Sequence, residues 1–285
     1  MDVSNRQAPT KVGSCSLPGR ARDIAVSDGF AYVAAQDGGL RVVDVSNPKA
    51  PSEVASYLPG VAARPGAPGQ WGPVVDAVAV AGRYAYLTYN YVPKGKNSWS
   101  SLLQVLDVSN PKVPAELGSC EPERSDLFLG VAVAGKYAYV ADKASTLWVV
   151  DISDPKDPKE MGSCEGISEP QDVVVAGNHA YVADDDGAMY IVDVSDPRDP
   201  KKVGVYADQG DRPGIAEAIA VAGRYAYVCD DGGGRLLVVD ISDPTAPTEV
   251  ASFEAPGETV GVVASGDYVY VNVLGGGLFI LKRMD

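Results

Sequence analysis

A short motif recurs along this chain and constrains its fold more than any other feature of the sequence. The motif reads Asp-Val/Ile-Ser-Asn/Asp-Pro, and a partial copy stands at residues 2–5. The full copies begin at Asp44, Asp107, Asp151, Asp193 and Asp240. The repeating unit is about 42 residues long, and the second spacing carries about 20 residues more. Repeats of this length are typical of supersecondary units that pack side by side, so the repeat decides the fold class.

Each unit shows the pattern of four short strands. Two apolar runs separated by a tight turn, as at residues 80–86, predict a β-hairpin. A third run, as at 236–240, leads into the motif, whose proline ends the strand because it has no N–H for the ladder. A fourth run, as at 249–253, completes the unit. Four antiparallel strands per repeat predict the blade of a β-propeller.

Six such units predict one all-β domain over residues 1–285, a six-bladed β-propeller of four-stranded antiparallel blades. The predicted blades span about 21–57, 75–120, 128–164, 170–206, 216–253, and 258–285 together with 1–15. The third strand at 278–281 has no motif after it, and the partial motif at 2–5 has no strand before it. We therefore predict that residues 11–15 add the outer strand of the last blade. This pairing would close the ring and remove an exposed sheet edge.

Three of the third-strand sequences, at residues 40–44, 189–193 and 236–240, resemble the repeat of the LVIVD family. The resemblance extends over nearly the whole chain. It implies a propeller, and it implies an exported or cell-surface location, because members of the family often belong to such proteins. It implies no particular ligand or reaction.

Charge and hydropathy limit the partners that we expect. The 24 Lys and Arg residues against 38 Asp and Glu residues give a formal net charge of -14. Binding of phosphates needs clustered cations, so we expect no nucleic-acid partner. No apolar run reaches the roughly 18 residues of a membrane helix, so we expect no membrane insertion. The first residues lack the layout of a signal peptide, although a start at Met1 is compatible with an export signal that was removed.

The four cysteines are predicted to be unpaired packing residues. Cys15, Cys120 and Cys164 each end a fourth strand, where the other units have an aromatic residue, and Cys229 stands where other units have alanine. Equivalent positions in neighbouring blades are predicted to lie beyond the roughly 7 Å Cα limit for a disulfide. Free thiols favour a reducing compartment, in contrast to the exported tendency of the family. His179, the one histidine, takes the place of a hairpin tyrosine, so a histidine-based triad is not expected.

The extra residues of the second spacing form two segments, 58–74 and 89–100. Antiparallel topology places both on the same face of the predicted propeller. The insertion at 208–212 is predicted on this face as well. Aromatic, amide and cationic side chains suit a sugar, a peptide or a protein surface, and loops carry function more often than scaffolds do. The ligand-binding candidates are Arg22, Arg64, Gln70, Trp71, Tyr89, Tyr91, Trp99 and Arg212. The alternative is that the aromatic residues pack on each other and cap the blade.

A second candidate site consists of carboxylates at the start of the first strands, at the predicted mouth of the tunnel. They are Asp23, Asp76, Asp172 and Glu217. Period-two alternation predicts that Asp23 and Asp172 point into the tunnel, and they belong to blades three apart, which the ring would place opposite each other. Oxygen ligands suit a hard cation, of which calcium is the candidate. The alternative is that Arg20 and Arg22 pair with the carboxylates.

Three classes of function follow from these features. The first is a binding module for a protein, peptide or carbohydrate that uses the face with the long segments and the acidic tunnel mouth. The second is a lyase, isomerase or lactone hydrolase that uses the carboxylates, with or without a divalent cation. The third is a structural or assembly subunit. No catalytic set is visible and propellers host many unrelated functions, so the binding module is favoured. No residue spacing identifies the ligand.

Overall fold

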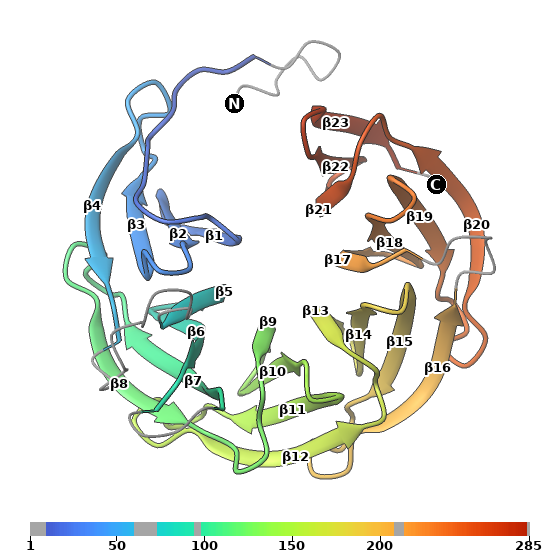
Figure 1. Ribbon diagram of the computed structural model, residues 1–285, viewed down its shortest axis with the longest axis horizontal. Coiled ribbons are helices and arrows are strands. Elements are labelled where there is room, and N and C mark those ends of the chain that lie inside the picture. Colours follow the sequence, from blue (N-terminus) through green and yellow to red (C-terminus); the bar gives the residue numbers. More distant parts are fainter. Residues whose placement is uncertain (1–9, 60–72, 94–97, 208–213, 284–285) are drawn as a thin grey trace. The chain divides into compact units, whose positions relative to one another are not determined.

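The computed structural model describes residues 10–59, 73–93, 98–207 and 214–283. Within these residues the chain forms strands β1 to β23. They pair into six antiparallel sheets, of which five have four strands and the last has three (Figure 1). The fold is therefore all-β and is a six-bladed β-propeller, which confirms the predicted fold class.

The strands follow the repeat. The first blade contains β1 Asp23–Ser27, β2 Phe30–Ala34, β3 Leu40–Asp44 and β4 Ser52–Tyr57, and the second contains β5 Val74–Ala81, β6 Tyr84–Tyr91, β7 Ser100–Asp107 and β8 Ala115–Cys120. The third contains β9 Phe128–Ala134, β10 Tyr137–Asp142, β11 Thr146–Asp151 and β12 Lys159–Glu165, and the fourth contains β13 Pro170–Ala176, β14 His179–Asp184, β15 Ala188–Asp193 and β16 Lys201–Ala207. The fifth contains β17 Ala216–Ala222, β18 Tyr225–Asp230, β19 Arg235–Asp240 and β20 Thr248–Glu254, and the sixth contains β21 Thr259–Ser265, β22 Tyr268–Val273 and β23 Gly277–Lys282.

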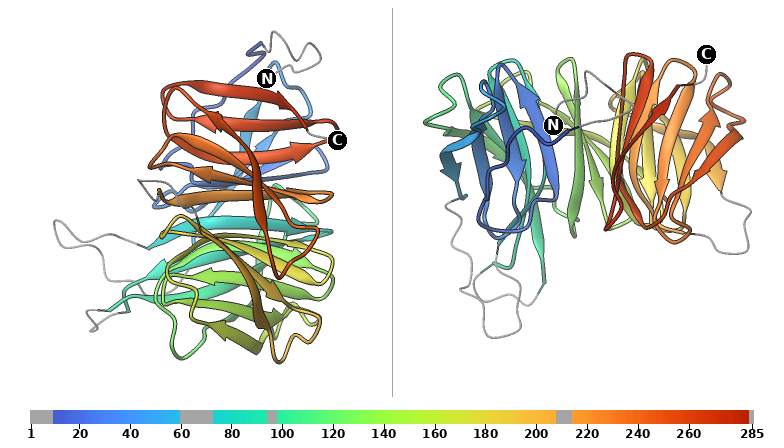
Figure 2. Two further views of the ribbon diagram at one scale, coloured as in Figure 1. Left: turned by 90° about the vertical axis from the view of Figure 1, so that its right-hand side faces the viewer. Right: turned by 90° about the horizontal axis from the view of Figure 1, so that it is seen from above.

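The chain divides into two compact units, residues 1–140 with 150–160 and residues 141–149 with 161–285. Within each unit the apolar core lies between adjacent blades, because both faces of a blade's sheet are covered by its neighbours. Leu40 and Val42 of the first blade pack with Leu87 and Leu102 of the second. Turns and hairpins gather at the two ends of the strands (Figure 2). Side chains at those ends are therefore the ones available for function.

A bulge and a small residue allow each outer strand to lie close to the motif turn of the next blade. The pairing of β15 with β16 shifts register between Ile191 and Val192, next to Gly204. A β-carbon added at Gly204 would lie 2.0 Å from the carbonyl oxygen of Pro244, in the motif turn of the following blade. Gly118 and Gly162 approach the turns at Lys156 and Pro197 in the same way, at 2.5 Å and 2.6 Å. The Gly-Ser-Cys sequences are therefore packing positions for the next blade's motif turn.

Residues 11–15, the predicted closing strand, lie in no strand of the structure, and the sheet of the sixth blade has three strands among the described residues. Gly13 nevertheless makes the contact of an outer strand. A β-carbon on Gly13 would lie 2.2 Å from the carbonyl oxygen of Pro48, in the motif turn of the first blade. Residues 11–15 therefore contact the first blade in the same way as the outer strand of a preceding blade contacts the next blade. Closure of the ring itself stays a prediction.

The first strand of the first blade shows an exposed apolar face. Ile24 is 59% exposed and Val26 is 66% exposed. The residues at the position of Ile24 in β5, β9, β13 and β17 are buried, namely Val78, Val131, Val173 and Ile219. This face of β1 is therefore apolar like the equivalent faces of the other first strands, which are buried against the preceding blade.

Candidate functional site

The second blade is the elaborated one. Its strands β5, β6 and β7 have eight residues each, whereas the other strands have five to seven. Segment 58–74 leads into β5 and segment 89–100 connects β6 to β7, so both attach at the same end of these strands. The predicted candidates Arg64, Gln70, Trp71 and Arg212 lie outside the described residues.

Two of the predicted aromatic candidates are core residues. Tyr89 is fully buried, and its ring is stacked on the ring of Tyr91 with the centroids 5.5 Å apart. The hydroxyl of Tyr91 donates a hydrogen bond of 3.2 Å to Glu121. Both rings therefore cap the blade, as the packing alternative has it, and offer little surface to a ligand. Trp99 is half-buried and Arg22 is exposed, so these two remain available.

A buried polar network fixes the base of segment 89–100. Asn90 is fully buried, and its Nδ2 donates to Oδ2 of Asp76 at 2.8 Å and to the carbonyl oxygen of Phe128 at 2.9 Å. Its Oδ1 accepts from the backbone N–H of Phe128 at 2.9 Å and from the hydroxyl of Ser101 at 2.6 Å. Gln36 of the first blade donates to the other oxygen of Asp76 at 3.2 Å. One network thus joins three consecutive blades.

The members of this network lie far apart in the sequence, so no sequence pattern connects them. Asp76 reads as one of the first-strand carboxylates, and Asn90 reads as part of a polar loop. One signal is present in the sequence: Gln36 and Asn90 occupy the same position in successive units, four residues after Tyr32 and Tyr86 respectively. Two amides at one repeat position indicate a shared structural role.

The first-strand carboxylates tie consecutive blades together. Oδ1 of Asp23 accepts from the N–H of Ile24 at 2.7 Å, and its Oδ2 accepts from the N–H of Val78 at 2.8 Å. Burial raises the pKa of Asp23, and these two backbone bonds oppose the rise. The partners that fix Asp23 are thus backbone amides rather than the predicted Arg20 and Arg22.

Asp172 repeats this arrangement in the second unit. Oδ1 of Asp172 accepts from the N–H of Val173 at 2.8 Å, and its Oδ2 accepts from the N–H of Ile219 at 3.1 Å. Both aspartates therefore aim at the first strand of the following blade, as do Ala25 and Val174 two residues further along. Alternation predicted that these positions face a tunnel. In the structure these side chains point toward the next blade instead, because each face of a blade's sheet is covered by a neighbouring blade.

The geometry of the described residues gives no support to the predicted metal site. Within residues 10–59, 73–93, 98–207 and 214–283, no group of three or more His, Cys, Asp or Glu side chains is arranged to hold a metal ion. The opposed placement of Asp23 and Asp172 stays a prediction, because these residues belong to different units. Glu217 stands at a register shift of β17, between Ala216 and Ala218.

All four cysteines are free thiols, and three of them are buried. Cys229 is fully buried in the core between the fifth and sixth blades, and burial raises its pKa to about 12.

Asp142, Asp184 and Asp230, which end second strands, are buried and hydrogen-bonded within their own turns. These groups are explained by packing and turn chemistry.

The blades, their register and their repeated turns define a β-propeller with six units. The chain belongs to the LVIVD repeat family, whose model matches residues 18–58, 74–121, 129–166, 169–208, 213–255 and 256–281. No curated protein sequence matches the chain. In the part of the chain that the structure describes, no helix has the length and apolar character required to cross a bilayer.

Solved structures with similar folds are distant in sequence. A protein from Lactobacillus plantarum is 14% identical, with a TM-score of 0.72 over 92% of this chain and 84% of that one. The computationally designed Ika8 protein is 13% identical, with a TM-score of 0.59 over 92% and 83%. The Cps50 (Swd1) β-propeller domain from Myceliophteria thermophila is 12% identical, with a TM-score of 0.59 over 93% and 98%. At these identities the likeness concerns the fold alone.

Proposed function

We propose that this protein is a binding module whose ligand surface is built on the second blade by segments 58–74 and 89–100. The observation that carries the proposal is the buried network around Asn90, which anchors the longest strands of the protein at the end where both segments attach. Satisfied buried networks rigidify a structure, and a rigid base that carries long segments is the usual construction of a recognition surface.

The composition of the two segments indicates the chemistry of the partner. They contain Arg64, Lys94 and Lys96 and no Asp or Glu, although the whole chain has 38 acidic residues. They also contain Trp71 and Trp99, two of the three tryptophans. Cations beside large aromatic rings favour a partner that offers carboxylates and apolar surface, so we propose an acidic peptide segment of a protein as the ligand.

The proposal is tested with a random-peptide display library that is selected on the immobilised full chain. The selected peptides are then measured by titration calorimetry against wild type, Trp71→Ala with Trp99→Ala, and Lys94→Ala with Lys96→Ala. We expect the selected peptides to be acidic, and each double variant to lose at least tenfold in affinity, about 1.4 kcal/mol, with unchanged circular dichroism.

Control variants change one exposed apolar residue and one exposed cation away from the two segments. Val205→Ala removes an apolar side chain that is 48% exposed on β16, and Lys201→Ala removes an exposed cation of the same strand. Both variants should bind as wild type does. Peptides that bind the loop variants and the wild type equally would place the ligand elsewhere, and selection of a carbohydrate in a parallel glycan screen would change the ligand class.

The enzyme alternative retains one supporting observation, the raised pKa of the Asp23 carboxyl. A carboxyl group with a raised pKa can act as a general acid or base, and such groups gather at catalytic sites. A screen of simple lactones, in which hydrolysis is measured by the release of protons, tests this alternative. Turnover that disappears in Asp23→Asn while the fold is retained would support it, and turnover that survives in the variant would remove Asp23 from the mechanism.

A further inference from the structure

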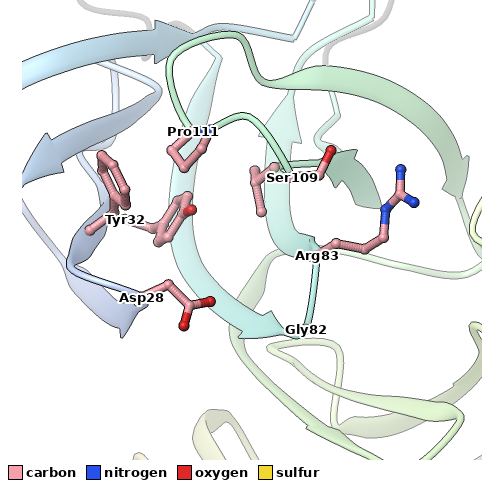
Figure 3. A pocket seen from close by; sticks show the side chains of 8 residues that line it. Asp28, Tyr32, Gly82, Arg83, Ser109 and Pro111 are labelled. Atoms are coloured by element: carbon pink, nitrogen blue, oxygen red, sulfur yellow. The ribbon is translucent and has the colours of Figure 1, made fainter.

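A pocket of about 330 Å³ lies between the first and second blades. It is found at the β1–β2 and β5–β6 turns, which is the end of the strands opposite to segments 58–74 and 89–100. Asp28, Phe30 and Tyr32 line it from the first blade, and the turns at Gly82 and Ser109 line it from the second (Figure 3). The turns at this end of the blades are short and uniform, so the sequence predicts no site there.

The residue at position 28 departs from the repeat. The other five blades have glycine at this point of the hairpin, with left-handed φ angles: Gly82 58°, Gly135 61°, Gly177 60°, Gly223 64° and Gly266 56°. Asp28 adopts the same conformation, with a φ of 49°. A side chain in this region costs about 1–2 kcal/mol relative to glycine, although aspartate tolerates it better than most residues. Asp-Gly is a favoured hairpin pair, but the repeat shows that the turn does not require a carboxylate.

The first blade also lacks the cation that follows this position in the second, third and fifth blades. Arg83 and Arg224 follow the glycine in the second and fifth blades and form ion pairs with Asp107 and Asp240. In the first blade Gly29 occupies this position. Among the described residues Asp28 accepts one hydrogen bond, of 3.2 Å from the hydroxyl of Ser27, and has no ion pair. Its charge is thus uncompensated at the pocket.

The remaining walls of the pocket are formed by Phe30, Tyr32, Val108 and Pro111, with Ser109 and Arg83 at the turns of the second blade. The ring of Tyr32 is buried, and burial together with the charge of Asp28 raises the pKa of its hydroxyl. Figure 3 shows the carboxylate of Asp28 directed into the space beneath Tyr32 and Pro111, with the guanidinium of Arg83 extending away from it. That guanidinium is already paired with Asp107. At Gly82 no atom lies within 4 Å of the place where a β-carbon would stand, so the space is open.

We propose that this pocket binds the basic side chain, lysine or arginine, of a partner polypeptide. A carboxylate beside a half-buried aromatic ring, here that of Phe30, is a combination that holds an ammonium or guanidinium group. The volume is near the lower end of ligand pockets, roughly 300–1,000 Å³, and suits one side chain. The net charge of -14 also attracts basic polypeptides. This site shares no residue with the proposed surface on segments 58–74 and 89–100, so either can fail without the other.

The test uses three capped tripeptides with the full chain: acetyl-Gly-Lys-Gly-amide, acetyl-Gly-Arg-Gly-amide, and the norleucine analogue, which has no charge. Binding is followed through the backbone amide signals of Gly29 and Gly82 in ¹H–¹⁵N spectra at low salt. We expect a saturable shift of these signals with the basic peptides and none with the norleucine peptide. Asp28→Asn should weaken binding at least fivefold, and Asp28→Gly, which restores the residue of the other repeats, should do the same without loss of thermal stability.

Asp267→Asn is the matched control, because it removes the same charge from the corresponding hairpin of the sixth blade. It should bind the basic peptides as wild type does. Equal shifts with the norleucine peptide, or unchanged affinity in Asp28→Asn, would overturn the proposal. Binding of n-butylammonium as tight as that of the lysine peptide would assign the pocket to a small organic cation and would likewise overturn the polypeptide as its ligand.

Discussion

The Oδ2 atom of Asp23 accepts a hydrogen bond of 2.8 Å from the backbone N–H of Val78, so a side chain of the first blade satisfies a donor on the first strand of the second. Asp172 and Ile219 repeat this relationship in the fourth and fifth blades, at 3.1 Å. In both receiving strands the pairing shifts register just before this residue, between Val75 and Val78 in β5 and between Ala216 and Ala218 in β17. Both strands are edge strands of their sheets, so N–H groups on the outer edge have no ladder partner, and the aspartates accept from them.

Replacing either aspartate by alanine should therefore destabilise the fold. Asp23→Ala and Asp172→Ala each remove a charged acceptor and leave a buried N–H without its partner, which costs about 1–3 kcal/mol. Urea unfolding followed by circular dichroism measures the loss. Asp37→Ala, at an exposed position of the first blade, is the control and should change stability by less than about 0.5 kcal/mol. Equal stability of all three variants would mean that the bonds contribute nothing.

The calcium hypothesis makes a separate prediction for the same residues. An ion that binds only the folded chain raises Tm with concentration. Calcium should then raise the Tm of the wild type, and the rise should disappear in Asp172→Asn. A Tm that stays constant up to several millimolar calcium removes the hypothesis, and it leaves Asp23 and Asp172 as ties between blades.

The repeat and its strands could be predicted from sequence because each blade is a local unit with its own apolar pattern and turn residues. Contacts between blades were less accessible. Asp23 reads as an exposed acid on an edge strand, and only the packing of the first blade against the second shows that it accepts from the N–H of Val78. Tyr89 reads as a loop aromatic, yet it is fully buried, because β6 continues to Tyr91 and carries both rings into the core. Asp28 could have been noticed, since it is the one non-glycine at its repeat position.

Acid should weaken the fold through the ion pairs of the second and fifth blades. The guanidinium of Arg83 and the hydroxyl of Ser109 lower the pKa of Asp107 to about 2, and Arg224 and Ser242 lower the pKa of Asp240 to about 2. A carboxyl whose pKa is lower in the folded state adds stability at pH values above its unfolded pKa, and this contribution is lost as the pH falls toward the folded pKa. The loss therefore falls between about pH 4 and pH 2.

The double variant Asp107→Asn with Asp240→Asn tests this assignment. Its urea midpoint should be lower than that of the wild type at pH 6 and should fall less steeply between about pH 4 and pH 2. Asp37→Asn, outside these ion pairs, should follow the wild-type curve. Parallel curves for the double variant and the wild type would assign the acid sensitivity to other carboxyls.

The glycines of the outer strands should tolerate no side chain. Gly204→Ala would place a methyl group 2.0 Å from the carbonyl oxygen of Pro244, so either the outer strand or the motif turn must move. Overpacking of this kind costs about 1–3 kcal/mol. Thermal unfolding of Gly204→Ala should show a Tm several degrees lower. Ala251→Gly, at the same position of β20, serves as the reverse substitution and should cost less. A Tm for Gly204→Ala equal to that of wild type would show that the turn yields freely.

Closure of the ring gives the last prediction, and Gly13 is the residue that tests it. A methyl group at Gly13 would lie 2.2 Å from the carbonyl oxygen of Pro48 and 2.9 Å from Cδ of Pro51, the same clash that Gly204 would meet. If residues 11–15 complete the sixth blade, Gly13→Ala should lower Tm as Gly204→Ala does, because the closing strand would be displaced. Lys11→Ala, at an exposed position of the same segment, should leave Tm unchanged.

Hydrogen exchange separates a closing strand from an arm that only rests on the first blade. A strand paired with β23 has alternate N–H groups in the ladder, so the amides at one parity of residues 11–15 should exchange orders of magnitude more slowly than in an unstructured peptide. Gly13→Ala should abolish that protection and should also increase exchange in β23, whose outer edge would then be unpaired. Unprotected amides at 11–15 in the wild type would mean that the sixth blade keeps three strands and that the ring is held without this pairing.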